Sequence, residues 1–199
     1  MYADDKIKDF LESVAAKRPT PGGGSVSAVV GSLGAALGVM TARFSGDAEA
    51  EQGLDGLKGE LVALADADAE AYGMVSSAMS LPKDSEDTKR RRKAALQSAL
   101  SDASEVPLRG MGMCVKGLDL LAVLGPKCNK HLVSDLAGAC GFLWAALEGC
   151  GENVRINAGS LADKERGAKL EAERTRLQAA GAAARDRVRK AVESVYAGK

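Results

Sequence analysis

The stretch from Pro19 to Ala42 constrains the fold most, because it carries no charged side chain. As a helix it would be long enough to cross a bilayer. It opens, however, with two prolines and three consecutive glycines, and it has few bulky apolar side chains. Small residues recur in it at four-residue spacing, as in Ser27, Gly31 and Ala35. Because such a stripe lets helix backbones approach closely in soluble cores as well as in membranes, we expect a buried helix over about 25–45 and no membrane association.

Composition favours helices along the whole chain. Aromatic residues make up 4%, Ile occurs twice and Thr four times, whereas Ala, Leu and Gly are abundant. Strands prefer β-branched and aromatic residues, and helices prefer Ala and Leu. With 199 residues, 46% of them apolar, the chain can bury one sizeable core. We therefore predict an all-α, single-domain bundle of about six helices with no sheet, spanning residues 1–199.

Charge and cysteine usage exclude several classes of protein. Lys+Arg and Asp+Glu both count 27, so no basic excess supports nucleic-acid binding. The four cysteines show no CxxC spacing and the chain has one histidine, which argues against a Cys/His zinc site. The N-terminus is acidic and lacks the basic-then-apolar pattern of a signal peptide. We expect a cytoplasmic protein with reduced cysteines, no bound metal, and no nucleic-acid or membrane partner.

Apolar periodicity predicts the other helices. A short amphipathic helix is expected over about 4–16, ending before Pro19 because the residue that precedes a proline is disfavoured in a helix. Longer helices are expected over about 52–79, 85–124, 134–149 and 164–196. Pro107 should bend the second of these, since proline removes a hydrogen bond within the helix.

One carboxylate interrupts the apolar seam of the helix expected over 52–79. The seam recurs in steps of three and four residues and consists of Leu57, Leu61, Leu64, Tyr72, Val75 and Met79. Its gap falls on Asp68. A carboxylate on a buried stripe is costly unless it is paired or hydrogen-bonded. Asp68 is therefore a hydrogen-bonded structural residue, a point where the seam reaches the surface, or a functional acid.

The segment Pro21-Gly22-Gly23-Gly24-Ser25 is a candidate binding loop. It lacks the lysine of a Walker loop, and it follows a helix instead of the strand that precedes a dinucleotide-binding loop. Residues without a Cβ let a ligand or another backbone come close, and the next helix offers free N–H groups. A plain flexible turn explains the segment equally well.

Several other polar residues allow two interpretations each. Asp135 follows Ser134 at an expected helix start, where helix capping alone explains the pair. Asn153 and Asn157 share a face in a helix, and in an extended segment Arg155 joins them, so polar groups converge in either conformation.

Two charged features have simpler explanations. His131, the one histidine, is more typical of a surface loop than of a general base. The basic run 89–93 winds around its helix, which favours a solvated surface, although a role in attracting an anionic ligand stays open.

Six motifs, in this order, resemble the cyclodeaminase/cyclohydrolase family. They are the segments 19–25, 66–72, 81–83, 106–108, 134–135 and 153–157. Members include the cyclodeaminase domain of formimidoyltransferase-cyclodeaminase and the stand-alone methenyltetrahydrofolate cyclohydrolase. The resemblance runs from about Phe10 to the last helix. The family's usual Gly-Asn before the Ser-Asp pair stands here as Cys128-Asn129.

The resemblance implies a helical homodimer that binds a reduced folate and uses no cofactor beyond it. Both family reactions pass through a tetrahedral carbon held between N5 and N10 of tetrahydrofolate. Since no formimidoyltransferase segment is present, we expect hydrolysis of 5,10-methenyltetrahydrofolate to 10-formyltetrahydrofolate. The alternatives are a cyclodeaminase that releases ammonia from formimidoyltetrahydrofolate, and a non-catalytic helical scaffold or folate-binding protein.

On this resemblance, Asp68 and Asp135 supply acid/base chemistry and pair with amidinium charge, facing one small hollow. Burial would raise the pKa of Asp68 and suit it to proton transfer. The folate would pack on the loop from Pro21 to Ser25. The other expected substrate-binding residues are Asn153 and Asn157, toward the pterin or the tetrahedral oxygen, and Arg155 or Lys127, toward the glutamate tail.

Overall fold

The computed structural model describes residues 1–198, and Lys199 of the predicted domain lies outside the described residues. The six α-helices are α1 (Ile7–Ala15), α2 (Gly23–Ser45), α3 (Ala48–Met79), α4 (Glu86–Leu124), α5 (Val133–Gly159) and α6 (Lys164–Ala197). Short 3-10 turns lie at Tyr2–Asp4, Gly125–Lys127 and Lys130–Leu132. Residues 1–198 contain no strand, so the predicted all-α bundle of about six helices is confirmed.

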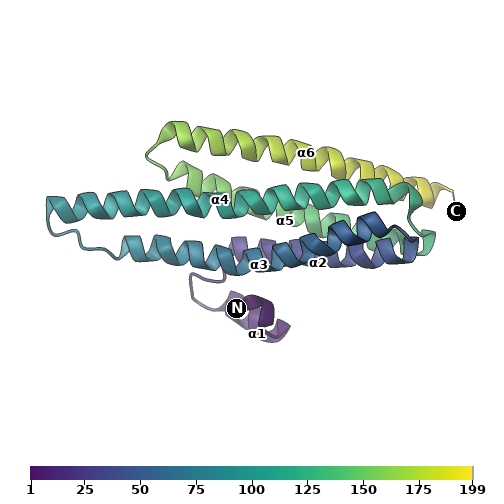
Figure 1. Ribbon diagram of the computed structural model, residues 1–199, viewed down its shortest axis with the longest axis horizontal. Helices are drawn as coiled ribbons and strands as arrows, with labels where there is room; N and C mark the ends of the chain where they lie inside the picture. Colours follow the sequence, from purple (N-terminus) through teal and green to yellow (C-terminus); the bar gives the residue numbers. More distant parts are fainter. Residues whose placement is uncertain (199) are drawn as a thin grey trace.

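The five long helices lie side by side along the long axis of the molecule (Figure 1). Helix α2 packs against α3 and α5, α4 packs against α3 and α5, and α6 covers α4 and α5. The short helix α1 lies below the bundle and is joined to it by a loop that leads into α2 (Figure 1). The predicted loop over 21–25 is shorter than expected, because Gly22 is the N-cap of α2 and Gly23, Gly24 and Ser25 form its first turn.

Side chains at the helix ends explain where the helices begin. The Asp47 side chain accepts a hydrogen bond from the Ala50 N–H at the start of α3. Ser85 and Thr88 exchange hydrogen bonds in a capping box at the start of α4. Gly46, with φ of 70°, ends α2 in the left-handed conformation that favours glycine.

The small-residue stripe of α2 is buried and brings helices close together. A Cβ added to Gly34 would lie 3.0 Å from the Leu143 backbone nitrogen of α5, and one added to Gly38 would lie 3.0 Å from Leu121 of α4. Both distances are tighter than most Cβ contacts, so glycine lets these helices approach without displacing their neighbours. The buried helix predicted over 25–45 is confirmed, two residues longer at its N-terminus.

Part of the apolar surface stays uncovered in the single chain. Ile7 of α1 is 78% exposed, and on the outer side of α2 Leu33 is 56% and Phe44 is 66% exposed. By length and composition alone α2 and α5 could span a membrane, but a core helix of a soluble protein passes the same test. These two helices pack against each other inside the bundle.

The basic run and the cysteines match the simpler expectations. Lys89 pairs with Glu86, and Arg90 and Arg91 pair with Asp87, all on exposed surface. The cysteines among residues 1–198 are free thiols. Three are buried in the core and Cys128 is half-buried.

Candidate active site

A hollow of about 350 Å³ opens between the glycine-rich loop, α3, α4 and α5. Its polar side chains include Asp68 and Tyr72 from α3, with Asn153 and Asn157 from α5. Its apolar wall includes Val75, Met79, Leu100 and Ile156. A concave, mostly apolar site with a few convergent polar groups is the usual form of a small-molecule site. The structure thus brings together the glycine loop, one predicted acid and two predicted asparagines.

Asp68 is held against the N-terminus of α2. The Ser25 hydroxyl donates to Asp68 Oδ2 at 2.9 Å, and it also lies 3.0 Å from the Ala65 carbonyl oxygen. Burial raises the pKa of the Asp68 carboxyl above its ordinary value, and hydrogen bonds from the Ser25 hydroxyl and backbone oppose this rise. Asp68 is therefore a fixed, partly desolvated carboxyl group that faces an open hollow.

The first turn of α2 needs glycine at Gly24. A Cβ added to Gly24 would overlap the carboxylate of Asp68. A Cβ added to Gly23 would lie 3.3 Å from the side-chain nitrogen of Asn153. The backbone at the start of α2 therefore comes close to two predicted site residues, as expected for close approach and unlike a merely flexible turn.

On the expectation that Asp68 is an acid/base group, Gly24→Ala should lower turnover by roughly 100-fold, because displacing a reacting group by about 1 Å has an effect of that order. Steady-state kinetics on a reduced folate would measure the loss. The matched control is Gly73→Ala, also in a helix, where an added Cβ meets nothing within 4 Å. This control should keep full turnover and gain roughly 0.5–1 kcal/mol of stability. Equal turnover in both variants would separate Gly24 from the reaction.

The asparagines bind backbone carbonyls. Asn153 Nδ2 donates to the Gly149 carbonyl oxygen at 2.8 Å, within α5. Asn157 Nδ2 donates to the Ala103 carbonyl oxygen of α4 at 3.0 Å. Pro107 lies four residues after Ala103 and has no N–H, so that carbonyl lacks its helical partner. Asn157 therefore replaces the missing hydrogen bond and fixes α5 to α4 beside the hollow.

This pairing predicts a coupled effect on stability. Asn157→Leu should lower the free energy of unfolding by about 1–3 kcal/mol, because it leaves the Ala103 carbonyl without a partner. In a Pro107→Ala background the loss should be smaller, since alanine restores the backbone N–H to that carbonyl. Urea unfolding of both single variants and the double variant measures the coupling. Strictly additive effects would contradict this role of Asn157.

Asp135 and Lys127 lie near the start of α5, far from the hollow. Asp135 opens α5, and at about 1.5 Å per residue it lies roughly 27 Å from Asn153 along the helix axis. Lys127 Nζ is 2.7 Å from Asp47 Oδ2, at the start of α3. The expectation that Asp68 and Asp135 share one hollow is wrong for the single chain, and Lys127 does not reach the hollow either. The reason is that α5 is one unbroken helix.

Arg155 lies beside the hollow and not inside it. It is exposed, with Nη1 3.8 Å from Glu152 Oε2. It lines an open depression that shares Asn153, Ile156 and Ser160 with the hollow. His131 is exposed in the turn before α5, near Asp135 and away from Asp68.

The leucine seam of α3 predicts core positions for two residues that instead line the hollow. Tyr72 and Met79 continue the leucine seam, yet they are 41% and 51% exposed and line the hollow. The position of Asp68 in that seam predicts their place, because Tyr72 and Met79 follow Asp68 on the same face of the helix. Thr20 and Leu100 also line the hollow and carried no signal in the sequence.

Pro21 is buried and is not among the residues that line the hollow. Within residues 1–198, no group of three or more His, Cys, Asp or Glu side chains is arranged to hold a metal ion.

Comparisons with known proteins place the chain in one family. The family model for formiminotransferase-cyclodeaminase matches residues 6–176. The methenyltetrahydrofolate cyclohydrolase of Methylorubrum extorquens is 33% identical over 175 residues, covering 82% of this chain and 84% of that protein. The formimidoyltransferase-cyclodeaminase of Gallus gallus is 37% identical over 171 residues, 78% of this chain but 31% of that protein.

A solved structure has the same fold over its whole length. The crystal structure of formiminotetrahydrofolate cyclodeaminase from Thermotoga maritima matches with a TM-score of 0.87 and 28% identity, over 98% of this chain and 100% of that one. The family match includes the glycine-rich loop, Asp68, Asn153 and Asn157. The chain therefore belongs to the formiminotransferase-cyclodeaminase family.

Proposed function

We propose that this protein hydrolyses 5,10-methenyltetrahydrofolate to 10-formyltetrahydrofolate in the hollow that contains Asp68. The observation that carries the proposal is the fixed, partly desolvated Asp68 carboxyl facing this hollow. The cyclohydrolase of Methylorubrum extorquens, which this chain matches over most of both lengths, supports the choice of reaction.

In the proposed reaction, Asp68 first pairs with the cationic N5–C–N10 bridge of the substrate. Water then attacks the bridge carbon while Asp68 takes one of its protons, which gives a neutral tetrahedral carbinol. The C–N5 bond breaks next, N5 accepts the proton from Asp68, and the carbinol hydroxyl loses its proton to solvent. The formyl group stays on N10, and one proton is released for each turnover.

The lining of the hollow supports a partial fit of the folate. At about 350 Å³ the hollow is at the small end of the range for ligand sites, so we place the pterin and the one-carbon bridge inside it. Asn153 and Asn157 would present their side-chain oxygens to the pterin N–H groups, since their nitrogens bind backbone carbonyls. The glutamate tail would leave over Ile156 toward Arg155.

We further propose that the enzyme works as a cytoplasmic homodimer with no cofactor beyond its folate. The exposed apolar residues along α2, which include Leu33 and Phe44, support a two-fold contact through this helix. Asn129, just ahead of α5, donates its backbone N–H to the Ser45 hydroxyl, so the end of α2 lies near the start of α5. An antiparallel contact between two α2 helices would therefore place Asp135 of the partner subunit near Asp68.

The activity test compares two substrates. With 5,10-methenyltetrahydrofolate the enzyme should speed the loss of methenyl absorbance well above the uncatalysed rate. With 5-formimidoyltetrahydrofolate, ammonia release would instead support the cyclodeaminase, which the Thermotoga maritima structure favours as second candidate. Calorimetric binding of a reduced folate without turnover of either substrate would indicate a binding protein. Absence of binding and turnover would reject the proposed function.

A further inference from the structure

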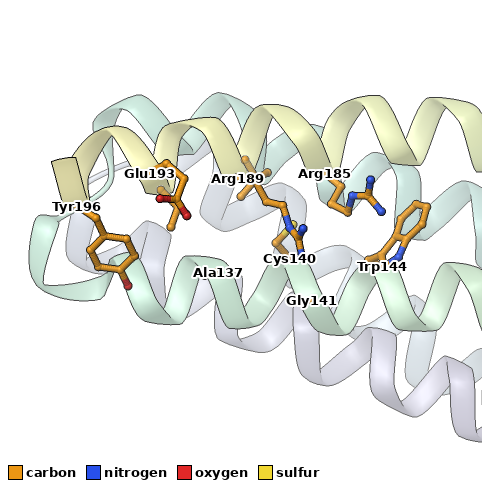
Figure 2. Close-up of a pocket in the computed structure, with 10 residues that line it drawn as sticks. Ala137, Cys140, Gly141, Trp144, Arg185, Arg189, Glu193 and Tyr196 are labelled. Atoms are coloured by element: carbon orange, nitrogen blue, oxygen red, sulfur yellow. The ribbon is translucent and has the colours of Figure 1, made fainter.

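A second hollow, of about 450 Å³, lies between α5 and the C-terminal part of α6. Figure 2 shows Trp144 at one end of it and Tyr196 at the other, with the side chains of Arg185 and Arg189 between them. Gly141 lies about 18 Å from Asn153 along α5, at 1.5 Å per residue, so this hollow is separate from the one at Asp68. Its α6 residues also follow residue 176, where the family match ends.

The hollow combines positive charge with aromatic surface. The Arg185 guanidinium lies 4.3 Å from the centre of the Trp144 ring and pairs with Asp186 at 2.8 Å. Arg189 has no ion pair or hydrogen bond within residues 1–198, so its charge is available to a ligand. Glu193 adds one carboxylate at the same edge.

The Cys140 thiol lies at the floor of this second hollow. Burial raises the pKa of this thiol to about 11, and the charges of Arg189 and Arg185 oppose that rise. The positive charges of Arg185 and Arg189, on α6, therefore influence the floor of the hollow electrostatically. The thiol itself stays protonated and uncharged at neutral pH, so it adds no negative charge that would repel an anion.

The hollow exists because α5 has short side chains here. Ala137 and Gly141 line it from α5 beside Cys140 and Trp144, and a Cβ added to Gly141 meets nothing within 4 Å. Packing does not require glycine at this position. A Cβ at position 141 enters open space, so a larger side chain there would extend into the hollow.

We propose that this hollow binds a small organic anion that carries a flat aromatic ring, of the size of a nucleoside monophosphate. Arg189 would bind the anionic group, because a guanidinium forms paired hydrogen bonds to phosphate or carboxylate oxygens. The ring would lie along the aromatic wall beside the Arg185–Trp144 stack. Glu193 would accept N–H groups at the ring edge. This site is independent of the folate reaction.

The test uses the fluorescence of Trp144, the one tryptophan of the chain. Guanosine and adenosine 5′-monophosphate are titrated separately into the full chain, with calorimetry as a second measurement. At least one nucleotide should change the Trp144 emission and saturate below millimolar concentration, whereas the matching nucleoside and inorganic phosphate should each bind more weakly. No response to either nucleotide up to millimolar concentration overturns the proposal.

Two variants locate the binding. Arg189→Gln should weaken it about ten-fold, as expected for loss of one charge-assisted contact. Gly141→Leu should abolish it by filling the hollow. The matched controls are Arg187→Gln, which removes a charge paired with Asp119, and Gly56→Leu, at another exposed glycine with no neighbour within 4 Å. Equal binding by Gly141→Leu and the unchanged protein would place the ligand elsewhere and overturn the proposal.

Discussion

Asp68→Asn should reduce the turnover of methenyltetrahydrofolate by about 100- to 10,000-fold, the usual contribution of a positioned general base. The amide keeps the shape of the carboxyl group and an oxygen that accepts from Ser25, so the fold should remain intact. It cannot take a proton from water or balance the charge of the one-carbon bridge. Stopped-flow measurement of methenyl absorbance with the pure variant would show the loss.

The control for Asp68 is Glu70→Gln, two residues further along α3. Glu70 is exposed and does not line the hollow, so removal of its charge should leave turnover unchanged. Circular dichroism of both variants checks that each is as helical as the parent. Nearly full turnover in a folded Asp68→Asn protein would exclude the proposed role of this residue.

The raised pKa of Asp68 also predicts how activity and stability depend on pH. Proton abstraction needs the carboxylate form, so turnover should decline as pH falls through a pKa that lies above the ordinary carboxyl value. Stability should change in the opposite direction. The folded state binds this proton more tightly than the unfolded state does, so the free energy of unfolding falls as pH rises through the same window.

Asp68→Asn removes this titration. At neutral pH the variant should therefore be at least as stable as the parent, because the buried charge is gone and the Ser25 contact is kept. Urea unfolding at several pH values would show a flatter profile for the variant. A large loss of stability at neutral pH would instead mark Asp68 as a structural residue whose charge the fold needs.

The sequence was sufficient to predict the half of the site that depends on local pattern. Asp68 stands out because a carboxylate breaks a leucine seam, and the seam itself follows from helix periodicity. The glycine run is informative because three residues without a Cβ mark the start of a helix whose first N–H groups are free. The structure joins these two signals, since Gly24 leaves the space that the Asp68 carboxylate fills.

The length of α5 could not be predicted from the sequence pattern. Gly149 and Gly151 suggest a helix end, yet α5 continues through them to Gly159; Gly149 allows close packing against α2, whereas Gly151 is in ordinary contact with α4. A Cβ on Gly149 would overlap the Ser27 hydroxyl of α2, and one on Gly151 would lie 3.4 Å from Met111 of α4. Tertiary packing therefore overrides the low helix propensity of glycine. The unbroken helix is what separates Asp135 from Asp68.

The sequence predicts only part of the hydrogen bond that joins Asn157 to the helix turn before Pro107. A proline inside a long helix predicts a carbonyl without its partner four residues earlier, which is Ala103. Only the packing of α5 on α4 shows which side chain supplies the missing donor. One hydrogen bond next to the hollow thus joins Asn157 to the turn of α4 that Pro107 leaves without a backbone donor.

The separation of the two acids leads to the second large effect, a complementation between inactive variants. If each site combines Asp68 of one chain with Asp135 of the partner subunit, Asp68→Asn and Asp135→Asn should each lose at least about 100-fold in turnover. Mixing them under conditions that exchange subunits should then restore activity. Half of the random dimers are mixed, and each mixed dimer has one intact site of two, so recovery should approach about a quarter of the parent activity.

Three outcomes are distinguishable, because each geometry gives its own result. Sites that lie within single chains would stay inactive after mixing, since every chain carries one lesion. A fully active Asp135→Asn protein would make Asp135 a first-turn residue that only stabilises α5 through the helix dipole. Leu33→Asp, on the uncovered side of α2, provides the control: it should favour monomers in light scattering and lose turnover although both acids are present. A fully active monomer would show that the hollow around Asp68 is complete without a second copy.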